Sequence, residues 1–225
     1  MYLEQNIRAI CVRNGIDFNE FLSDLDVENV NELTIFDLEA VCEEYEVEML
    51  SLMFKPMFRN DLFANKIRKI KLLVLDVDGV MTDAGMYYTE NGDQIKKYNA
   101  RDGIAIQHLV KKGFQLAIIS SGYKAEMVKA RAELLGIQYC YVGREPKLEI
   151  LQSHCNELGI ELENVAIIGD DINDLDVFRK VGFSACPSDA VLVIKSHADV
   201  ILTKKGGEGC VREFVDGYLL NNPIT

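Results

Sequence analysis

The chain has 225 residues, of which 48% are hydrophobic and 27% charged. This composition is typical of a globular protein, and the length suffices for one sizeable domain and a small one. The formal net charge of −12 and the sequence pI near 4.8 argue against nonspecific binding to nucleic acid or to an anionic membrane. No apolar segment approaches membrane-spanning length, and the N-terminus lacks the pattern of a signal peptide. Six cysteines without a CxxC spacing favour free thiols and a cytoplasmic location.

The first 58 residues are predicted to form a small acidic domain of short helices. Residues 1–60 contain 13 Asp and Glu against 4 Lys and Arg, a net charge of −9. Thr34 is the expected N-cap of the third helix, with Asp37 in the capping-box position. The helices are expected at roughly 3–13, 17–24, 34–45 and 46–53.

The stretches NIRAICVRNGIDFNEFLSD and LTIFDLEAVCEEYEVEMLSLMFKP together resemble a degenerate helix-turn-helix domain of the phage-repressor type. A protein that reads DNA needs basic and amide side chains on its recognition helix, and this acidic segment has no such cluster. We therefore expect a module for docking, assembly or regulation, with a protein partner, or else an inert appendage. Its small core is expected to contain Leu38, Val41, Val47, Met49 and Leu52.

Residues 59–69 are predicted to be a linker, since Pro56 interrupts the preceding helix. From residue 70 to 225 apolar strands alternate with helical segments, which predicts an α/β fold with a doubly wound, Rossmann-like parallel sheet. Strands are expected at 71–76, 115–119, 138–142, 164–168, 181–185 and 199–202. Helices are expected at about 102–112, 123–135, 146–158, 172–180 and 189–196.

One segment departs from this alternation. Residues 85–98 alternate apolar and polar side chains around Asn91-Gly92. This dipeptide is a strong signal for a two-residue turn between antiparallel strands. The sequence therefore predicts a β-hairpin inserted after the first strand.

Polar residues follow the ends of several predicted strands. In a doubly wound sheet, ligands bind at the carboxyl ends of the strands, where the strand order reverses. Lys147 opens the helix that precedes the fourth strand. The candidates at this edge of the sheet are Asp76 and Asp78 after the first strand, Ser120, Ser121 and Gly122 after the second, and Asp170, Asp171 and Asp174 after the fourth.

These residue types form a coherent set for phosphoryl transfer. Asp76, Asp78 and Asp170 are the candidate metal ligands, with a backbone carbonyl among the donor atoms, and such an oxygen set suits Mg²⁺. Asp76 is the candidate nucleophile toward phosphorus and Asp78 the candidate acid and base. Ser120, or alternatively Ser121, and Lys147 are the candidates for contacting the phosphoryl group.

The segments DVDGV, the serine after the second strand, Lys147 and GDDINDL resemble the four motifs of the haloacid dehalogenase superfamily, in its phosphatase branch. No large cap insertion lies between the first motif and Ser120. The segments YNARDGIAIQHL and GGEGCVRE are similar to those of the capless sugar-acid phosphatases typified by 3-deoxy-D-manno-octulosonate 8-phosphate phosphatase. The resemblance covers about residues 66–220.

This resemblance implies a Mg²⁺-dependent phosphomonoesterase that acts on a keto-deoxy sugar acid phosphate through an aspartyl phosphate. It implies that Asp171 and Asp174 support the metal site, Asp174 through water. It also implies a homotetramer in which the hairpins assemble and neighbouring subunits help to close each site. Arg101, Gly122 and Arg212 are then the candidates for binding the substrate, with an ion pair to Asp102 as the alternative for Arg101.

Two departures from the family pattern affect the substrate rather than the chemistry. Tyr123 stands where an arginine is expected, and the first motif is followed by DAG. A nine-carbon sugar acid phosphate therefore remains an alternative substrate. A non-catalytic regulatory or scaffolding protein, acting through the N-terminal helices, is the alternative of another class.

Overall fold

The computed structural model describes residues 2–54, 59–92, 94–122 and 124–220, and the chain forms two compact units, Met1–Asn65 and Lys66–Thr225. Helix α5 (Arg59–Ile67) occupies most of the segment that was predicted to be a linker, and the boundary between the units falls within it. The domain limits at residues 58 and 70 stay predictions. None of the helices in the described part of the chain has the length and apolarity needed to cross a membrane.

The N-terminal unit packs short helices around a small apolar core, in which Ile7, Ile10 and Leu52 are almost inaccessible to solvent. The predicted capping box is confirmed, because Thr34 N donates to Asp37 Oδ2 (2.7 Å) and Asp37 N donates to Thr34 Oγ1 (3.3 Å). The expected core residues lie inside or at the edge of this cluster. The elements are α1 (Tyr2–Asn14), α2 (Phe18–Asp24), η1 (Val30–Glu32), α3 (Ile35–Glu44) and α4 (Met49–Phe54).

The second unit is built on a six-stranded sheet in which every pairing is parallel. The strand order is β5-β4-β1-β6-β7-β8, so β1 is central and the chain order reverses beside it. Each strand overlaps a predicted one, which confirms the doubly wound fold. The strands are β1 (Leu72–Leu75), β4 (Gln115–Ser120), β5 (Tyr139–Val142), β6 (Val165–Ile168), β7 (Phe183–Cys186) and β8 (Val200–Ile201).

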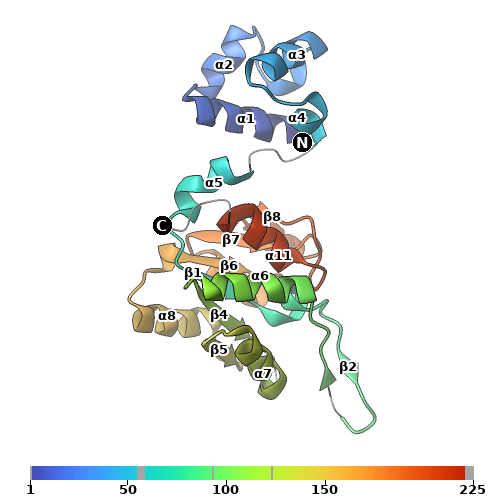
Figure 1. The fold of residues 1–225 in the computed structure, drawn as a ribbon, viewed down its shortest axis with the longest axis vertical. Helices are drawn as coiled ribbons and strands as arrows, with labels where there is room; N and C mark the ends of the chain where they lie inside the picture. The colour runs from blue at the N-terminus through green and yellow to red at the C-terminus, as the bar shows by residue number, and fades with distance from the viewer. Residues whose placement is uncertain (1, 55–58, 93, 123, 221–225) are drawn as a thin grey trace. The chain divides into compact units, whose positions relative to one another are not determined.

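Helices cover both faces of this sheet (Figure 1). Helices α6 to α10 overlap the predicted helical segments, and two further helical elements, α11 and η5, follow β8. Gly136 ends α7 in the left-handed conformation that favours glycine. The helical elements after β1 are η2 (Val77–Met81), α6 (Ala100–Lys111), α7 (Ala125–Leu135), α8 (Lys147–Leu158), η3 (Leu162–Asn164), η4 (Ile172–Asp174), α9 (Leu175–Phe178), α10 (Leu192–Lys195), α11 (Cys210–Phe214) and η5 (Val215–Leu219).

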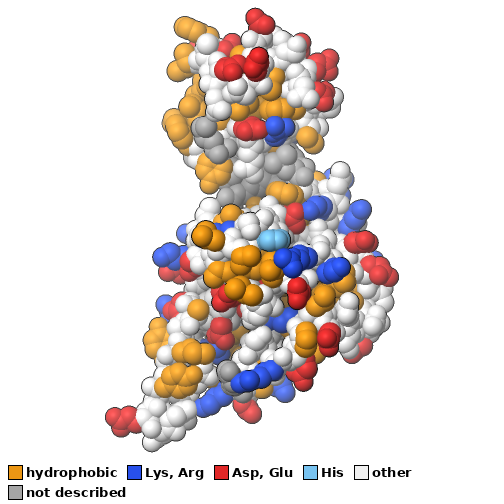
Figure 2. All heavy atoms as spheres, turned by 180° about the vertical axis from the view of Figure 1, so that it is seen from behind, with side chains coloured by type: hydrophobic (Ala, Val, Ile, Leu, Met, Phe, Trp, Pro, Cys, Tyr) orange, Lys and Arg blue, Asp and Glu red, His pale blue; other side chains and the backbone are white. Residues whose placement is uncertain are grey.

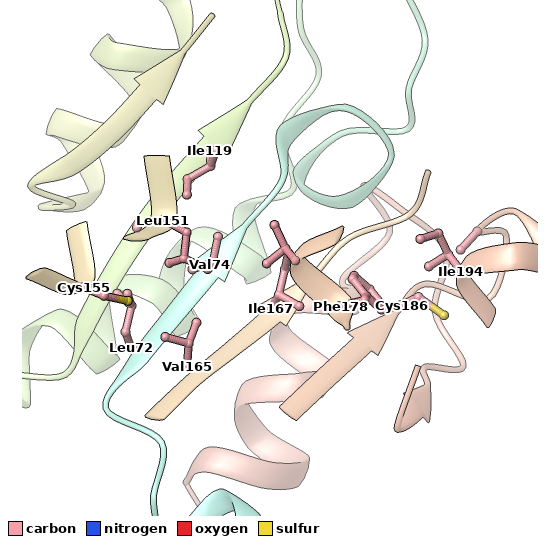
Figure 3. Packing of buried hydrophobic residues seen from close by; sticks show 13 residues of the cluster. Leu72, Val74, Ile119, Leu151, Cys155, Val165, Ile167, Phe178, Cys186 and Ile194 are labelled. Atoms are coloured by element: carbon pink, nitrogen blue, oxygen red, sulfur yellow. The ribbon is translucent and has the colours of Figure 1, made fainter. Parts of the chain in front are cut away.

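Alternate residues of the central strands point to opposite faces, and this alternation divides the core. Leu72 and Val74 of β1 pack with Leu151 and Cys155 of α8 on one face (Figure 3). The buried strands are therefore apolar on both sides, as expected for a parallel sheet covered by two helical layers. All residues of β1 and β6 are apolar, and Asp76 and Asp170 come only after these strands end.

The predicted hairpin is confirmed by strands β2 (Tyr87–Tyr88) and β3 (Gln94–Ile95), which pair antiparallel. Gly92 has a φ of +80° in the turn, a conformation that favours glycine. The hairpin extends away from the body of its unit (Figure 1). Several of its apolar side chains are exposed: Met86, Tyr87, Tyr88 and Ile95.

The carboxyl group of Asp102 is buried where α6 packs against α11, and the residue is only 3% exposed. Its Oδ1 accepts a hydrogen bond from Arg212 N at 2.7 Å. Its Oδ2 has no hydrogen-bond partner among the described residues. Burial raises the pKa of Asp102 to about 6, against the opposing effects of this hydrogen bond and of Arg131 and Arg212.

Protonation of Asp102 is therefore expected to stabilise the fold. Between its ordinary pKa of 3.8 and about 6, the folded chain holds a proton that the unfolded chain has lost, so this contribution to stability is lost as the pH rises through that window. A shift of about two units corresponds to about 3 kcal/mol. In urea unfolding, Asp102→Asn should gain up to about 3 kcal/mol relative to the unmodified chain between about pH 4 and about pH 7. A difference that does not change with pH would contradict this prediction.

Candidate active site

The loop after β1 holds Asp76 at the centre of the sheet edge. Asp76 N donates to Ile168 O of the neighbouring strand, which extends the ladder to this residue. Its carboxylate is almost buried, and Oδ1 accepts a hydrogen bond from Val77 N at 2.7 Å. The other carboxylate oxygen accepts no hydrogen bond from the described residues. Asp76 thus has one fixed oxygen and one oxygen available for chemistry.

Lys147, at the first position of α8, lies between two carboxylates. Its Nζ is 3.0 Å from Asp76 Oδ1 and 2.7 Å from Asp174 Oδ1, and its side chain is only 4% exposed. Burial alone would lower the pKa of Lys147, but the attraction of Asp76 and Asp174 outweighs it, so the pKa is raised. Lys147 therefore remains a cation beside Asp76.

Three carboxylates converge next to this lysine. Oxygens of Asp76, Asp170 and Asp174 all lie within 4.8 Å of one another. Burial and the repulsion of Asp174 raise the pKa of Asp76, and burial together with the repulsion of its acidic neighbours raises the pKa of Asp170 to about 8. The site therefore has more negative charge than Lys147 balances.

The donor atoms present fit a divalent cation. Asp170 Oδ1 is buried and has no hydrogen-bond partner in the described part of the chain, although buried carboxylate oxygens are normally paired. Mg²⁺ binds oxygen ligands and commonly takes one or two carboxylates together with water. Asp76 and Asp170 are placed to supply them, since Asp174 is already held by Lys147 and by Asp170 N at 3.1 Å.

Gly79 keeps the loop close to this group. Its φ is +90°, and a Cβ atom at this position would lie 2.0 Å from Asp170 Oδ2. Only glycine leaves room for the carboxylate here. The spacing between the β1 loop and Asp170 thus depends on the absence of a side chain at Gly79.

Asp78 points to a different partner from Asp76. Its Oδ1 forms an ion pair with Nζ of Lys96, which follows β3 of the hairpin. The same oxygen accepts a longer hydrogen bond from Thr82 Oγ1 at 3.3 Å. The two aspartates of the first motif are therefore neutralised by two different lysines, and Lys96 was not predicted from the sequence.

Of the two candidate serines, Ser120 has the arrangement expected of a phosphoryl donor. It is 2% exposed, and its Oγ accepts a hydrogen bond from Gly122 N at 3.2 Å. The hydroxyl hydrogen remains available to donate to an anion. Ser121 Oγ instead accepts from the side-chain amide of Asn173 at 3.1 Å. This contact ties the loop after β4 to the loop after β6.

The remaining candidates have other contacts. The carboxylate of Asp171 caps η4 by accepting from Ile172 N at 2.7 Å, and it lies outside the three-carboxylate cluster. Arg101 is exposed at the start of α6 and forms no ion pair with Asp102. Arg212 Nε lies 2.5 Å from Asp216 Oδ2. Tyr123 is outside the described residues.

A second unpredicted feature is the close approach of the GGEG segment to the β1 loop. A Cβ atom at Gly206 would lie 2.0 Å from Gly79 O. Gly207 N donates to Val80 O at 2.9 Å, and Cys210 Sγ donates to the same oxygen at 3.2 Å. The backbone that follows β8 thus fixes the loop that contains Asp78.

Replacing Lys147 by methionine is expected to destabilise the chain by about 3 kcal/mol, because two buried carboxylates lose their cation. It should also lower kcat by about 10²-fold. Urea unfolding and phosphate release measure the two effects. Lys66→Met is the control, since Lys66 forms an exposed pair with Asp199, and such a pair contributes less than about 1 kcal/mol. Equal effects of the two substitutions would contradict the assignment.

The fold and this site define a hydrolase of the haloacid dehalogenase type, and a family model described as haloacid dehalogenase-like hydrolase matches residues 96–182. The 3-deoxy-D-manno-octulosonate 8-phosphate phosphatase KdsC of Escherichia coli K12 is 41% identical over 155 residues, which are 69% of this chain and 82% of that protein.

Solved structures of such phosphatases are similar to this chain as well. That of Yersinia pestis has a TM-score of 0.68 and 36% identity, covering 71% of this chain and 86% of that chain. That of Moraxella catarrhalis, in complex with a magnesium ion, a phosphate ion and a KDO molecule, has a TM-score of 0.67 and 37% identity, covering 69% and 89%. The chain belongs to the haloacid dehalogenase-like hydrolase family and is a magnesium-dependent phosphatase.

Proposed function

We propose that this phosphatase hydrolyses 3-deoxy-D-manno-octulosonate 8-phosphate in the cytoplasm, releasing inorganic phosphate and the sugar acid. The relatives described above carry this activity in their names. The observation that supports it most directly is the buried Lys147, which contacts both Asp76 and Asp174 beside Asp170. These charged groups are placed to act together in phosphoryl transfer.

In the first step an oxygen of Asp76 attacks phosphorus, and the bond from phosphorus to the sugar oxygen breaks. Asp78 enters this step with a proton on its other carboxylate oxygen and donates it to the leaving oxygen. In the second step water attacks the phosphorus of the aspartyl phosphate while Asp78 takes up a proton from that water. The bond between Asp76 and phosphorus breaks, phosphate is released, and both aspartates return to their starting state.

Charge on the transferred group is balanced by fixed donors. Lys147 stays protonated next to Asp76, and the hydroxyl of Ser120 is free to donate to a phosphoryl oxygen. Asp76, Asp170 and the backbone carbonyl of Asp78 would hold Mg²⁺, which would supply further positive charge to the phosphoryl oxygens. Asp174 supports the metal site by fixing Lys147 and the Asp170 backbone, with Asp171 holding the turn that carries them.

The deciding experiment is phosphate release with Mg²⁺ from eight-carbon and nine-carbon keto-deoxy sugar acid phosphates and from hexose phosphates. We expect a strong preference for the eight-carbon compound that is lost in EDTA. Preference for the nine-carbon compound would assign the alternative substrate. Arg101, Gly122 and Arg212 would then be the candidates for binding that compound. Equally weak or absent release from every compound would favour the non-catalytic alternative.

We also propose a homotetramer in which the hairpins pack together. The exposed side chains of Met86, Tyr87, Tyr88 and Ile95 support this, since clustered exposed apolar residues commonly mark protein interfaces. A site without a cap also gains protection from water when a neighbouring subunit covers it. Light scattering of the full chain should give the mass of four copies, and a monomeric mass at assay concentration would contradict the proposal.

For residues 1–58 we propose docking to a protein partner rather than binding to DNA. Acidic and hydrophobic side chains lie side by side on the surface of this unit (Figure 2). Ile35, Phe36, Leu50 and Phe54 are each more than half exposed. No salt-dependent binding to duplex DNA is expected, and such binding in a titration with the full chain would contradict this proposal.

A further inference from the structure

The lysine that contacts Asp78 comes from the hairpin, not from the sheet. Lys96 directly follows β3, and its side chain is only 5% exposed. Its Nζ donates to Asp78 Oδ1, the oxygen that also accepts from Thr82 Oγ1. Asp78 Oδ2 accepts no hydrogen bond from the described residues. One oxygen of Asp78 is therefore held by Lys96 and Thr82, and the other is left without a hydrogen bond from the described residues.

The neighbouring residues show that burial of this lysine is specific. Lys97 has a side chain that is 67% exposed, and its Nζ lies 3.6 Å from Asp83, as expected for a surface pair. Ile95, which precedes Lys96 in the chain, is also exposed. A lysine is rarely removed from water without a charged partner, because desolvation opposes it. Lys96 has that partner in Asp78.

We propose that Lys96 is a positioning residue for proton transfer by Asp78, so that the hairpin completes the acid–base site. This inference rests on the proposed function. By holding Oδ1, Lys96 directs the protonated Oδ2 toward the leaving oxygen. The proton moves from Oδ2 to the leaving oxygen as the bond between that oxygen and phosphorus breaks. In the second step Oδ2 takes a proton from the attacking water. Lys96 itself keeps its protons throughout.

The test compares Lys96→Met with Lys97→Met in the full chain with saturating Mg²⁺. The single-turnover rate of aspartyl-phosphate formation is measured with a sugar acid phosphate and with p-nitrophenyl phosphate. For Lys96→Met we expect a loss of at least about 10-fold with the sugar phosphate, whose alkoxide needs a proton to leave. With p-nitrophenyl phosphate we expect less than about threefold loss, because nitrophenolate leaves without one.

Several outcomes would overturn the inference. Unchanged rates in Lys96→Met, equal losses on both substrates, or the same selective loss in Lys97→Met would each do so. Lys96→Met is expected to unfold cooperatively above the assay temperature and to bind Mg²⁺, and thermal unfolding and Mg²⁺ titration check both, which separates positioning from a general defect in folding. If the unmodified chain released phosphate from neither substrate, the proposed function would fail and this inference with it. If the unmodified chain turned over both substrates and Lys96→Met showed no selective loss on the sugar acid phosphate, only the role of Lys96 would be overturned.

Discussion

Replacing Asp76 by asparagine is expected to lower kcat by about 10⁴-fold or more, because an amide cannot form the phosphorylated intermediate. The fold should survive, since Val77 N and Lys147 can donate to the amide oxygen as they do to Oδ1. Phosphate release under saturating substrate and Mg²⁺ measures the effect. The chain should also stop incorporating label from ³²P-labelled substrate.

Asp176→Asn is a suitable control for that experiment. Asp176 carries an exposed carboxylate that is 3.7 Å from Arg179 and lies outside the active site. The control should keep kcat within about twofold, as expected for a surface substitution. Retention of most of the activity in Asp76→Asn would show that another group acts as nucleophile.

Gly79→Ala is expected to weaken the metal site while leaving most of the fold intact. The new methyl group would occupy the position of the Asp170 carboxylate, only 2.0 Å from Oδ2. Either the β1 loop or Asp170 must move, and the ligands of the metal then separate. We expect Mg²⁺ affinity to fall by about 10- to 100-fold, as seen when metal ligands lose their support, and phosphate release to fall with it.

The matched control is Gly113→Ala. Gly113 has a similar φ of +77°, but a Cβ atom there meets nothing within 4 Å. The Gly113→Ala substitution therefore introduces the same backbone strain without a steric contact. It should lower the stability of the fold by about 1 kcal/mol with little change in Mg²⁺ affinity. Calorimetric titration with Mg²⁺ compares the two variants. Equal affinities would contradict the role of Gly79.

The sheet and the carboxylates at its edge could be predicted because local patterns determine both. Apolar runs and helical segments alternate along the chain, and parallel strands bring their carboxyl ends to one edge. Asp76 and Asp170 are thus brought together by topology alone. The hairpin was predictable for the same reason, since Asn91-Gly92 specifies its turn locally.

Other parts of the site could not be predicted because they depend on packing between distant segments. A lysine in a polar, alternating hairpin is normally solvated, and nothing in its local sequence indicates that Lys96 is buried against Asp78. Likewise, glycines after the last strand indicate a turn, not the contact of Gly206 with Gly79 O. Helix α5 was missed because Pro56 marks a break in the chain without showing that a new helix begins at Arg59.

The contact between the GGEG segment and the β1 loop also has a consequence for the order in which the enzyme matures during synthesis. Asp76 and Asp78 are translated well before Gly206, Gly207 and Cys210, which fix their loop. Domains that fold during translation do so as their segments emerge from the ribosome. A nascent chain can therefore form its central strands early, whereas the catalytic loop is set only after the last strand has been made.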